Sequence, residues 1–370
     1  MKKILTIMIL SIITIFLISF IILPKEEFSE IENRNLSTFP KISLKAITDG
    51  TYTEDIETYI NDHFPFRNIF MNIKTITNKI LGKKDINDVY LGKDNYLLEI
   101  YSTIDYQEKL TSTINKLHTN NPDINMNIML IPTKISIYNN KLPNNAHFEN
   151  QQQLIDNIYS NLDTDIKTIS IYNTLIQERN NYQLYYKTDH HWTTYGAYFG
   201  YQELAKANDI NYIDINDFDI KTVTNSFKGS TYSKVVDPFS ENENIDIFNY
   251  QKYNINVEYV LSKEQTNSLY NYDYLDKKDK YAMFLDNNHP LIKITNNDLN
   301  NDDNILIIKD SYANSMVPFL TNHYKQIYII DPRYYKKSIT KYIEENDIQN
   351  ILILYNVGTL STDSNILSIR

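Results

Sequence analysis

The chain has 370 residues, of which 42% are hydrophobic and 22% charged, and its formal net charge is −10. This composition supplies enough apolar side chains for one large folded domain or two moderate ones, which excludes a disordered chain. Because the charge is negative and no basic patch is apparent, nucleic acid is excluded as a partner. The absence of cysteine excludes disulfides, cysteine nucleophiles and thiolate zinc sites.

An uncharged apolar run extends from Ile4 to Leu23, directly after two lysines. It is long enough to cross a bilayer as one helix. A cleaved signal peptide is the competing interpretation, but its apolar region would be shorter and followed by small residues, whereas Pro24 and Lys25 follow here. The lysines before the span place the rest of the chain outside the cytoplasm. We therefore predict a single-pass cell-membrane protein with a signal-anchor over residues 1–23.

The segment after the anchor predicts a tether and then a folded domain. Residues 24–50 are polar and are expected to form the tether, and residues 51–370 to form the domain. The domain begins with two short amphipathic helices that are interrupted around Pro65. The stretch "DVYLGKDNYLLEI" predicts a β-hairpin with its turn at residues 92–95.

Five apolar runs have the continuous hydrophobic character of strands that are buried on both faces. Helical segments fit between them, so we predict a parallel α/β sheet flanked by helices. The strands are expected at 126–133, 166–173, 304–310, 326–331 and 350–356, and the helices around 105–120, 150–161, 193–207 and 334–346.

Between about residues 210 and 300 the pattern changes. Tyrosine-rich pieces such as "NINVEYVL" and "SLYNYDYL" alternate polar and apolar residues, which is typical of antiparallel strands. We expect an antiparallel β-rich insertion or a long lid in this region.

The stretch "YYKTDHHWTTYGAY" places Asp189, His190, His191 and the single tryptophan, Trp192, side by side. A helix is expected to begin after Thr193, which is a suitable N-cap, so the four residues lie in a strand-to-helix loop. Loops of this kind carry ligand chemistry in α/β sheets. Successive side chains of an extended loop point to opposite sides, so Asp189 and His191 are expected to share a side and His190 to face away.

Three interpretations of this cluster compete. A metal site is chemically suitable, but the other histidines form no familiar ligand pattern. A structural role is the second interpretation, with Asp189 as a cap and the aromatic ring in the core. A hydrolase-type triad is the third, and it requires a serine from elsewhere in the chain.

Ser311 meets that requirement. It comes just after the apolar strand "NILIIK", with only Asp310 between them, and begins a helical turn, which exposes its hydroxyl at the carboxyl edge of the sheet. Backbone N–H groups at such a turn can receive a developing oxyanion. An ordinary N-cap is the alternative role for Ser311, and Ser315, one turn later, is a weaker nucleophile candidate.

The motifs, taken together, resemble a known family. The sequence "TDHHWT" resembles that of the DHHW proteins, which are similar to the alginate O-acetyltransferases of the AlgJ and AlgX kind within the SGNH hydrolase superfamily. The family motif pairs an aspartate with the histidine two residues on, which maps onto Asp189 and His191, and the nucleophile maps onto Ser311. Asp310 is a departure with no assigned role, and no C-terminal carbohydrate-binding module is recognisable. The segments that carry the resemblance are, in chain order, "ENRNLSTFP", "YINDHFPFR", "VYLGKDNYLL", "IPTKISIYNNKLP", "DHHWT" and "KDSYANS".

The resemblance implies an SGNH-like fold and O-acetylation of an extracellular polysaccharide through an acyl-enzyme, with no cofactor and no metal ion. The acyl donor would be supplied by a membrane-bound O-acyltransferase. Deacetylation by the same residues, with water as acceptor, is the alternative activity. A non-catalytic glycan-binding scaffold of an export complex is the alternative from another class. The candidate substrate-binding residues are His190, Trp192, Tyr312 and Asn356. Trp192 would stack on a sugar or lie in the core, and Asn356 would donate to an oxyanion or close a turn.

Overall fold

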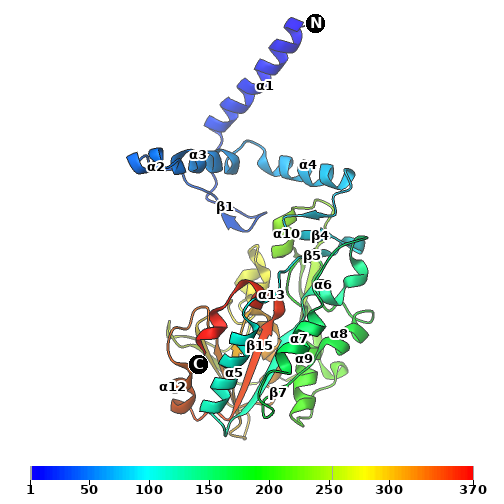
Figure 1. Ribbon diagram of the computed structural model, residues 1–370, viewed down its shortest axis with the longest axis vertical. Coiled ribbons are helices and arrows are strands. Elements are labelled where there is room, and N and C mark those ends of the chain that lie inside the picture. Colours follow the sequence, from blue (N-terminus) through cyan, green and yellow to red (C-terminus); the bar gives the residue numbers. More distant parts are fainter. Residues whose placement is uncertain (1, 252, 370) are drawn as a thin grey trace. The chain divides into compact units, whose positions relative to one another are not determined.

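The structure, a computed structural model, describes residues 2–251 and 253–369 (Figure 1). The chain forms two compact units. The first comprises residues 1–87 and 232–240, and the second comprises residues 88–231 and 241–370. The division into anchor, tether and domain that the sequence suggested stays a prediction.

The first unit begins with the apolar helix. The most apolar 18-residue stretch of helix α1 (Lys2–Ile22) has a mean hydropathy of 2.9, and none of the residues of the helix is buried. Its length and composition are those of a membrane span or a signal sequence. The helices α3 (Thr51–Asp62) and α4 (Arg67–Ile80) lie on either side of Pro65, which confirms the predicted interruption. The short helix α2 (Leu44–Thr48) and the two-residue strands β1 (Phe28–Ser29), β2 (Arg34–Asn35) and β3 (Asp85–Ile86) complete this part of the chain.

An ion pair ties the segments "ENRNLSTFP" and "YINDHFPFR" of the first unit together. Arg34 donates to both carboxylate oxygens of Asp62, at 3.0 and 2.5 Å, and the Ser37 backbone N–H donates to the same carboxylate at 2.9 Å. These bonds hold the pKa of Asp62 well below its ordinary value, chiefly through the hydrogen bonds from Arg34. Two motifs that are separate in the sequence are therefore joined in the structure by this ion pair and its hydrogen bonds.

The second unit is built on an eight-stranded sheet of order β11-β10-β12-β14-β13-β15-β6-β7. Its last five strands in this order pair in parallel, and they are the five strands that the apolar runs predicted. The first three pair antiparallel. The bounds are β6 (Asn125–Ile131), β7 (Lys167–Thr168), β13 (Asn304–Lys309), β14 (Gln326–Ile330), β15 (Asn350–Asn356), β10 (Ile255–Tyr259), β11 (Glu264–Thr266) and β12 (Leu291–Asn296).

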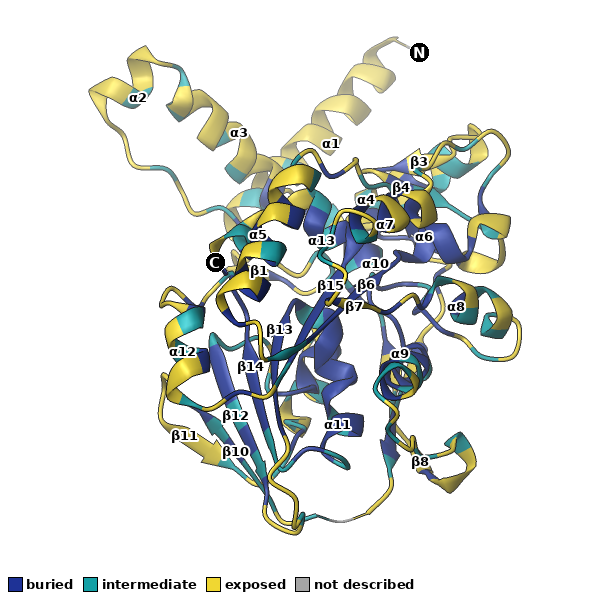
Figure 2. Ribbon diagram, turned by 60° about the horizontal axis from the view of Figure 1, so that its bottom comes forward, coloured by how far each residue is buried: buried dark blue, intermediate teal, exposed yellow. Residues whose placement is uncertain are grey.

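Both faces of the sheet are covered, as Figure 2 shows by the buried colour of the central strands. Alternate residues of β13 point to opposite faces: Ile305 and Ile307 join one apolar cluster, and Leu306 and Ile308 join the other. Helix α9 (Thr194–Ala207) contributes to the first cluster, and α5 (Gln107–Asn120) contributes to the second. The fold is thus α/β, with a mostly parallel sheet flanked by helices. Further helices are α6 (Lys134–Ile137), α7 (Gln151–Tyr159), α8 (Tyr172–Glu178), α10 (Ser230–Val235), α11 (Val317–Leu320), α12 (Ile339–Glu345) and α13 (Val357–Thr362).

The region from 210 to 300 contains antiparallel strands as predicted, but they are not one separate insertion. Strands β8 (Asp219–Phe227) and β9 (Glu243–Asn249) form a two-stranded sheet, whereas β10 to β12 extend the main sheet. The piece "SLYNYDYL" is wrong as a strand, because residues 272–276 form a 3₁₀ turn that Asn271 caps. The predicted hairpin is confirmed, with β4 (Val89–Leu91) antiparallel to β5 (Leu97–Glu99).

A buried charge cluster lies at the carboxyl edge of the sheet, where β13 and β14 end. The Nζ of Lys309 is 3.6 Å from Asp331, and both side chains are wholly buried. Arg333 also pairs with Asp331, through its Nε at 2.9 Å and its terminal nitrogen at 2.6 Å. Burial lowers the pKa of Lys309 to about 8, although the charge of Asp331 opposes this shift. Lys309 Nζ further donates to the side-chain oxygens of Asn288 and Asn314, at 2.6 and 2.7 Å.

Asp331→Ala is expected to lower the free energy of unfolding by about 3–5 kcal/mol, because it leaves the buried ammonium of Lys309 unpaired. Urea unfolding followed by the fluorescence of the buried Trp192 measures the change. Asp302→Ala is the matched control, since its side chain is 93% exposed and forms a surface ion pair with Lys325, and it should change stability little. Equal effects of the two substitutions would contradict this account of the cluster.

Candidate active site

Ser311 lies where the sequence placed it, two residues after the last residue of β13. The turn that it begins spans Ser311–Ser315, and its N-cap is Asp310, not Ser311. One oxygen of Asp310 accepts from the Tyr312 N–H at 2.9 Å, and the other accepts from the Asn356 N–H at 2.8 Å. Asp310 therefore ties the serine turn to the end of β15, which gives this residue the structural role that the sequence left open.

The DHHW segment forms a tight loop over residues 186–191 rather than a strand of the sheet. An antiparallel bridge between Tyr185 and Trp192 closes the loop. Helix α9 then begins at its N-cap, Thr193, whose hydroxyl accepts from the Gly196 N–H at 3.3 Å, as the sequence predicted. The bridge and the helix N-terminus therefore fix the two ends of the loop that carries the aspartate and the histidines.

Two buried charged side chains hold the backbone of this loop from either side. The Nζ of Lys134, from α6, donates to the carbonyl oxygens of residues 186, 187 and 189 at 2.8, 3.0 and 2.6 Å. The carboxylate of Glu243, from β9, accepts from the backbone N–H groups of residues 187 and 188 at 2.6 and 2.7 Å. Charge-assisted hydrogen bonds of this kind are stronger than neutral ones, so they fix the loop in one conformation.

The fold brings Ser311, His191 and Asp189 into one hydrogen-bonded chain. The Nε2 of His191 is 2.7 Å from the Ser311 hydroxyl oxygen, and its Nδ1 is 2.6 Å from Asp189 Oδ1. A carboxylate only accepts, so Nδ1 carries the proton and Nε2 accepts from the serine hydroxyl. This is the geometry of nucleophile, base and orienting acid.

The carboxylate of Asp189 is fully engaged by the protein. Besides the His191 ring, its Oδ1 accepts from the His191 backbone N–H at 2.9 Å. Its Oδ2 accepts from the backbone N–H and the hydroxyl of Ser230, at 2.7 and 3.0 Å. Gly229 lies so close that a Cβ there would be 2.1 Å from Asp189 Oδ2. Only glycine leaves room for the carboxylate at this position.

The protonation states follow from this environment. Burial alone raises the pKa of Asp189, but the charges of His190 and His191 and the hydrogen bonds hold it well below its ordinary value. Burial and, to a smaller extent, the charge of His190 together lower the pKa of His191 to about 4, although Asp189 opposes the shift. At neutral pH the pair is therefore a carboxylate beside a neutral imidazole, which can accept a proton.

Tyr281 completes the surroundings of the imidazole, and sequence analysis missed it. Its ring stacks on that of His191 with centroids 3.7 Å apart and planes 10° from parallel. Its hydroxyl is 3.2 Å from the Ser311 carbonyl oxygen and 3.0 Å from Ser315 Oγ. The stacked ring fixes the plane of the imidazole, which the hydrogen bonds alone leave free to tilt.

His190 does not face away from its neighbours, as the alternation rule predicted. The rings of His190 and His191 lie 3.8 Å apart, because the backbone turns tightly here instead of running extended. The Nδ1 of His190 is 2.6 Å from the hydroxyl of Ser230, which also donates to Asp189. The side chain is 31% exposed. It is thus the one aromatic side chain of the motif that remains open to a ligand.

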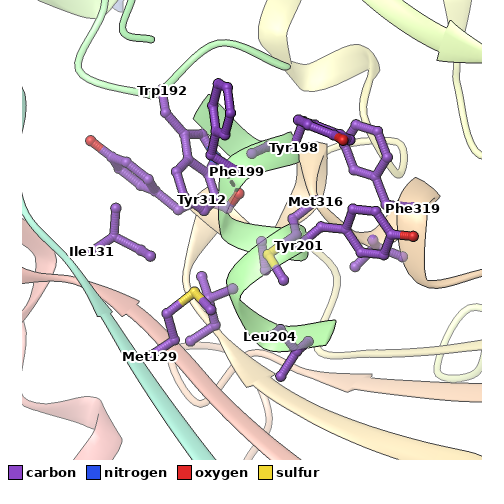
Figure 3. Packing of buried hydrophobic residues seen from close by; sticks show 14 of the residues in the cluster. Met129, Ile131, Trp192, Tyr198, Phe199, Tyr201, Leu204, Tyr312, Met316 and Phe319 are labelled. Atoms are coloured by element: carbon purple, nitrogen blue, oxygen red, sulfur yellow. Dashed lines mark hydrogen bonds between the residues drawn. The ribbon is translucent and has the colours of Figure 1, made fainter. Parts of the chain in front are cut away.

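Trp192 is a core residue and cannot stack on a sugar. Its side chain is wholly buried, and its Nε1 donates to the Tyr312 carbonyl oxygen at 2.9 Å and to Ser315 Oγ at 3.0 Å. Figure 3 shows the indole packed between Tyr312 and helix α9. At Gly200 a Cβ would lie 2.9 Å from the indole, so this glycine lets the helix approach the ring.

Tyr312, Asn356 and Ser315 also differ from their expected roles. Tyr312 is wholly buried, and its hydroxyl donates to the His190 carbonyl oxygen. The amide nitrogen of Asn356 donates to the carbonyl oxygens of residues 131 and 132, at 3.0 and 3.3 Å, so it joins β15 to β6 and does not reach an oxyanion. Ser315 is buried beneath the turn and accepts from Trp192, which removes it as a nucleophile.

The metal interpretation has one set of potential ligands among the described residues. Asp189, His190 and His191 can each offer a ligand atom, all within 4.8 Å of one another. However, both oxygens of the carboxylate and both ring nitrogens of His191 already have hydrogen-bond partners within the protein. The hydrogen bonds therefore favour the triad over a first coordination shell.

Several residues at the site gave a weak signal in the sequence or none. Lys134 is a charge within the apolar stretch "IPTKISIY", which could have marked a buried ammonium. Gly229, Ser230 and Tyr281 lie in the region read as an insertion or lid. Nothing in their local sequence links them to His191, which lies about 40 to 90 positions earlier in the chain.

The mostly parallel sheet with a serine, a histidine and an aspartate at its carboxyl edge defines an α/β protein with a hydrolase-type arrangement of side chains. The DHHW protein family matches residues 88–330, which is more than half of the chain. The chain therefore belongs to the DHHW family.

Two solved structures illustrate the shared fold. A DHHW family protein from Eubacterium siraeum is 19% identical, with a TM-score of 0.67 over 76% of this chain and 95% of that chain. PatB1 from Bacillus cereus, solved with a sulfonyl adduct, is 24% identical, with a TM-score of 0.64 over 76% of this chain and 98% of that chain. No curated protein matches the sequence. At these identities the likeness establishes the fold.

The imidazole of His191 is expected to stay neutral down to about pH 4. In the unfolded chain a histidine binds its proton near pH 6.5, so stability from this group is fully present above that pH and is lost as pH falls toward 4. NMR of protein labelled with ¹⁵N in its histidines measures the titration, and His191→Gln identifies the signal. A midpoint at or above 6.5 would contradict the buried, neutral imidazole.

Proposed function

We propose that this protein is an extracytoplasmic O-acetyltransferase that modifies a cell-surface or secreted polysaccharide. The observation that carries the proposal is the hydrogen-bonded chain from Ser311 through His191 to Asp189, with contacts of 2.7 and 2.6 Å. The likeness of the DHHW motif to that of the alginate O-acetyltransferases supports acetyl transfer as the reaction.

In the first step the Ser311 hydroxyl oxygen attacks the carbonyl carbon of the acetyl donor. His191 Nε2 takes the serine proton and returns it to the leaving group as the bond to the donor breaks, which leaves an acetyl ester on Ser311. In the second step a sugar hydroxyl gives its proton to Nε2 and attacks the ester. The serine oxygen leaves and recovers the proton. Asp189 remains ionised throughout and stabilises the imidazolium.

Helix α1 supports the extracytoplasmic location. It is apolar and unburied, and it begins with Lys2 and Lys3, which favours a single-pass anchor with the catalytic unit outside. Acetyl groups are made inside the cell, so a membrane-bound O-acyltransferase would have to deliver them across the bilayer. His190, half-exposed beside the nucleophile, is our candidate for contact with the acceptor.

Ser311→Ala is expected to reduce acetyl transfer from p-nitrophenyl acetate to an oligosaccharide by about three orders of magnitude or more. Because Asp310 caps the turn, the substitution should change the free energy of unfolding by less than about 1 kcal/mol. Ser315→Ala serves as the matched control: it removes a buried acceptor and should destabilise the protein while the acyl-enzyme still forms. An active Ser311→Ala protein would refute the triad. Acetate release without transfer would identify an esterase instead.

His191→Gln is expected to cost as much activity as the loss of Ser311, because the two act as one unit. His190→Gln should cost at most about 100-fold, through small displacements of Ser230 and Asp189. Initial rates for both variants, with and without zinc or EDTA, measure the difference. Equal losses, or activity that EDTA abolishes and zinc restores, would support the metal interpretation against ours.

A further inference from the structure

Helix α4 of the first unit carries an exposed apolar face. Ile69, Phe70, Ile73 and Ile80 are 56%, 43%, 50% and 80% exposed, and their spacing places them on one side of the helix. In the turn before the helix, Phe64 and Phe66 are 38% and 54% exposed. We call the surface formed by these six residues the α4 apolar face.

The opposite side of α4 is the side that the protein uses for packing. The Thr75 hydroxyl donates to the Val235 carbonyl oxygen at 2.8 Å, and Lys79 pairs with Asp237, so both residues bind the 232–240 segment of the same unit. Thr75 is buried, whereas Ile73 and Ile80 point away from that contact. The 232–240 segment therefore packs on the opposite side of α4, and each of the six residues of the α4 apolar face remains at least 38% exposed.

The backbone presents an aromatic ring on this face at a conformational cost. Phe66, which precedes the first residue of α4, has φ = 61° in the left-handed region. A bulky non-glycine residue is strained in this region. No burial of the ring within the protein compensates, because it is 54% exposed. Such strain is typical of a residue whose exposed position has a use.

The α4 apolar face is continuous with the proposed membrane span. The ring of Phe16 in α1 lies 5.3 Å from that of Phe64, 6.4 Å from that of Phe66 and 6.0 Å from that of Phe70. Phe16 precedes the helix end at Ile22 by six residues, or roughly 9 Å at the rise of an α-helix. The aromatic cluster is thus level with the outer part of the span, where aromatic side chains gather in membrane proteins.

We propose that residues 64–81 form a second membrane contact, in which the α4 apolar face lies in the outer interface of the bilayer. Exposed Lys74 flanks this face and exposed Lys83 follows it, so both can reach anionic headgroups. The partner is the lipid surface itself. This inference rests on the proposal that α1 spans the membrane, and it adds a contact that fixes the unit against the bilayer rather than leaving it on a flexible tether.

The natural absence of cysteine makes the test direct. Single cysteines replace Ile73 on the apolar face, Asn68 on the opposite side of the same helix, and Ile13 within α1. Each full-length variant is labelled with nitrobenzoxadiazole and reconstituted into vesicles of phosphatidylcholine and phosphatidylglycerol, with or without nitroxide-bearing lipids. Thermal unfolding of each labelled protein confirms that it is folded.

The proposal predicts blue-shifted emission and strong nitroxide quenching at Ile73→Cys, approaching the values at Ile13→Cys, with little of either at Asn68→Cys. Quenching at Ile13→Cys but not at Ile73→Cys would overturn the α4 contact and leave the anchor intact. No quenching at either position would overturn the anchor and the contact with it. A blue shift at Ile73→Cys without lipid quenching would show that a protein surface covers the face, which also overturns the proposal.

Discussion

A carboxylate that stays ionised while it is buried is the constraint on which the rest of the site depends. Asp189 is only 3% exposed, so its charge must be balanced by hydrogen bonds. Four contacts supply them, two from His191 and two from Ser230. The absence of a side chain at Gly229 creates the space. If any one of these groups moved, the imidazole would lose its orientation.

The loop that bears Asp189 is held by charges of opposite sign, which explains how so short a segment can be precise. The Lys134 ammonium donates hydrogen bonds to three carbonyl oxygens, and the Glu243 carboxylate accepts hydrogen bonds from two backbone N–H groups. Buried charges stabilise little in net terms, but they penalise alternative conformations that leave them unpaired. The same logic applies to Lys309 and Asp331 below the serine turn. The buried charges at the edge of the sheet therefore fix the positions of the catalytic side chains at a cost in folding stability, which is common at functional sites.

The sequence predicted the strands and helices of the fold more successfully than it predicted the side-chain contacts between them. Strands such as β13 were readable because both faces of a parallel sheet are buried, which leaves a continuous apolar run. The β10 to β12 strands were expected in an insertion because alternation reveals a strand but not the sheet that it joins. Ser311 and His191 could be paired because each lies at a strand end or loop that an α/β fold brings to one edge.

Side-chain orientation was the part that the sequence could not supply. The alternation rule for His190 assumed an extended loop, and the observed turn places the two imidazoles together. Trp192 and Tyr312 were expected to meet a ligand because aromatic residues bind sugars, but the same apolar area stabilises the core, and here burial dominates. Tyr281 reaches His191 only through tertiary packing, which leaves no mark in local sequence.

Covalent labelling of the intact protein tests the central claim most directly, namely that Ser311 is a nucleophile activated by His191. The protein is incubated with a sulfonyl fluoride at neutral pH, and mass spectrometry of its peptides locates the adduct. Our account predicts one sulfonyl group on Ser311, formed rapidly in the natural protein and only slowly in His191→Gln. Labelling at another serine, or an equal rate in both proteins, would contradict it.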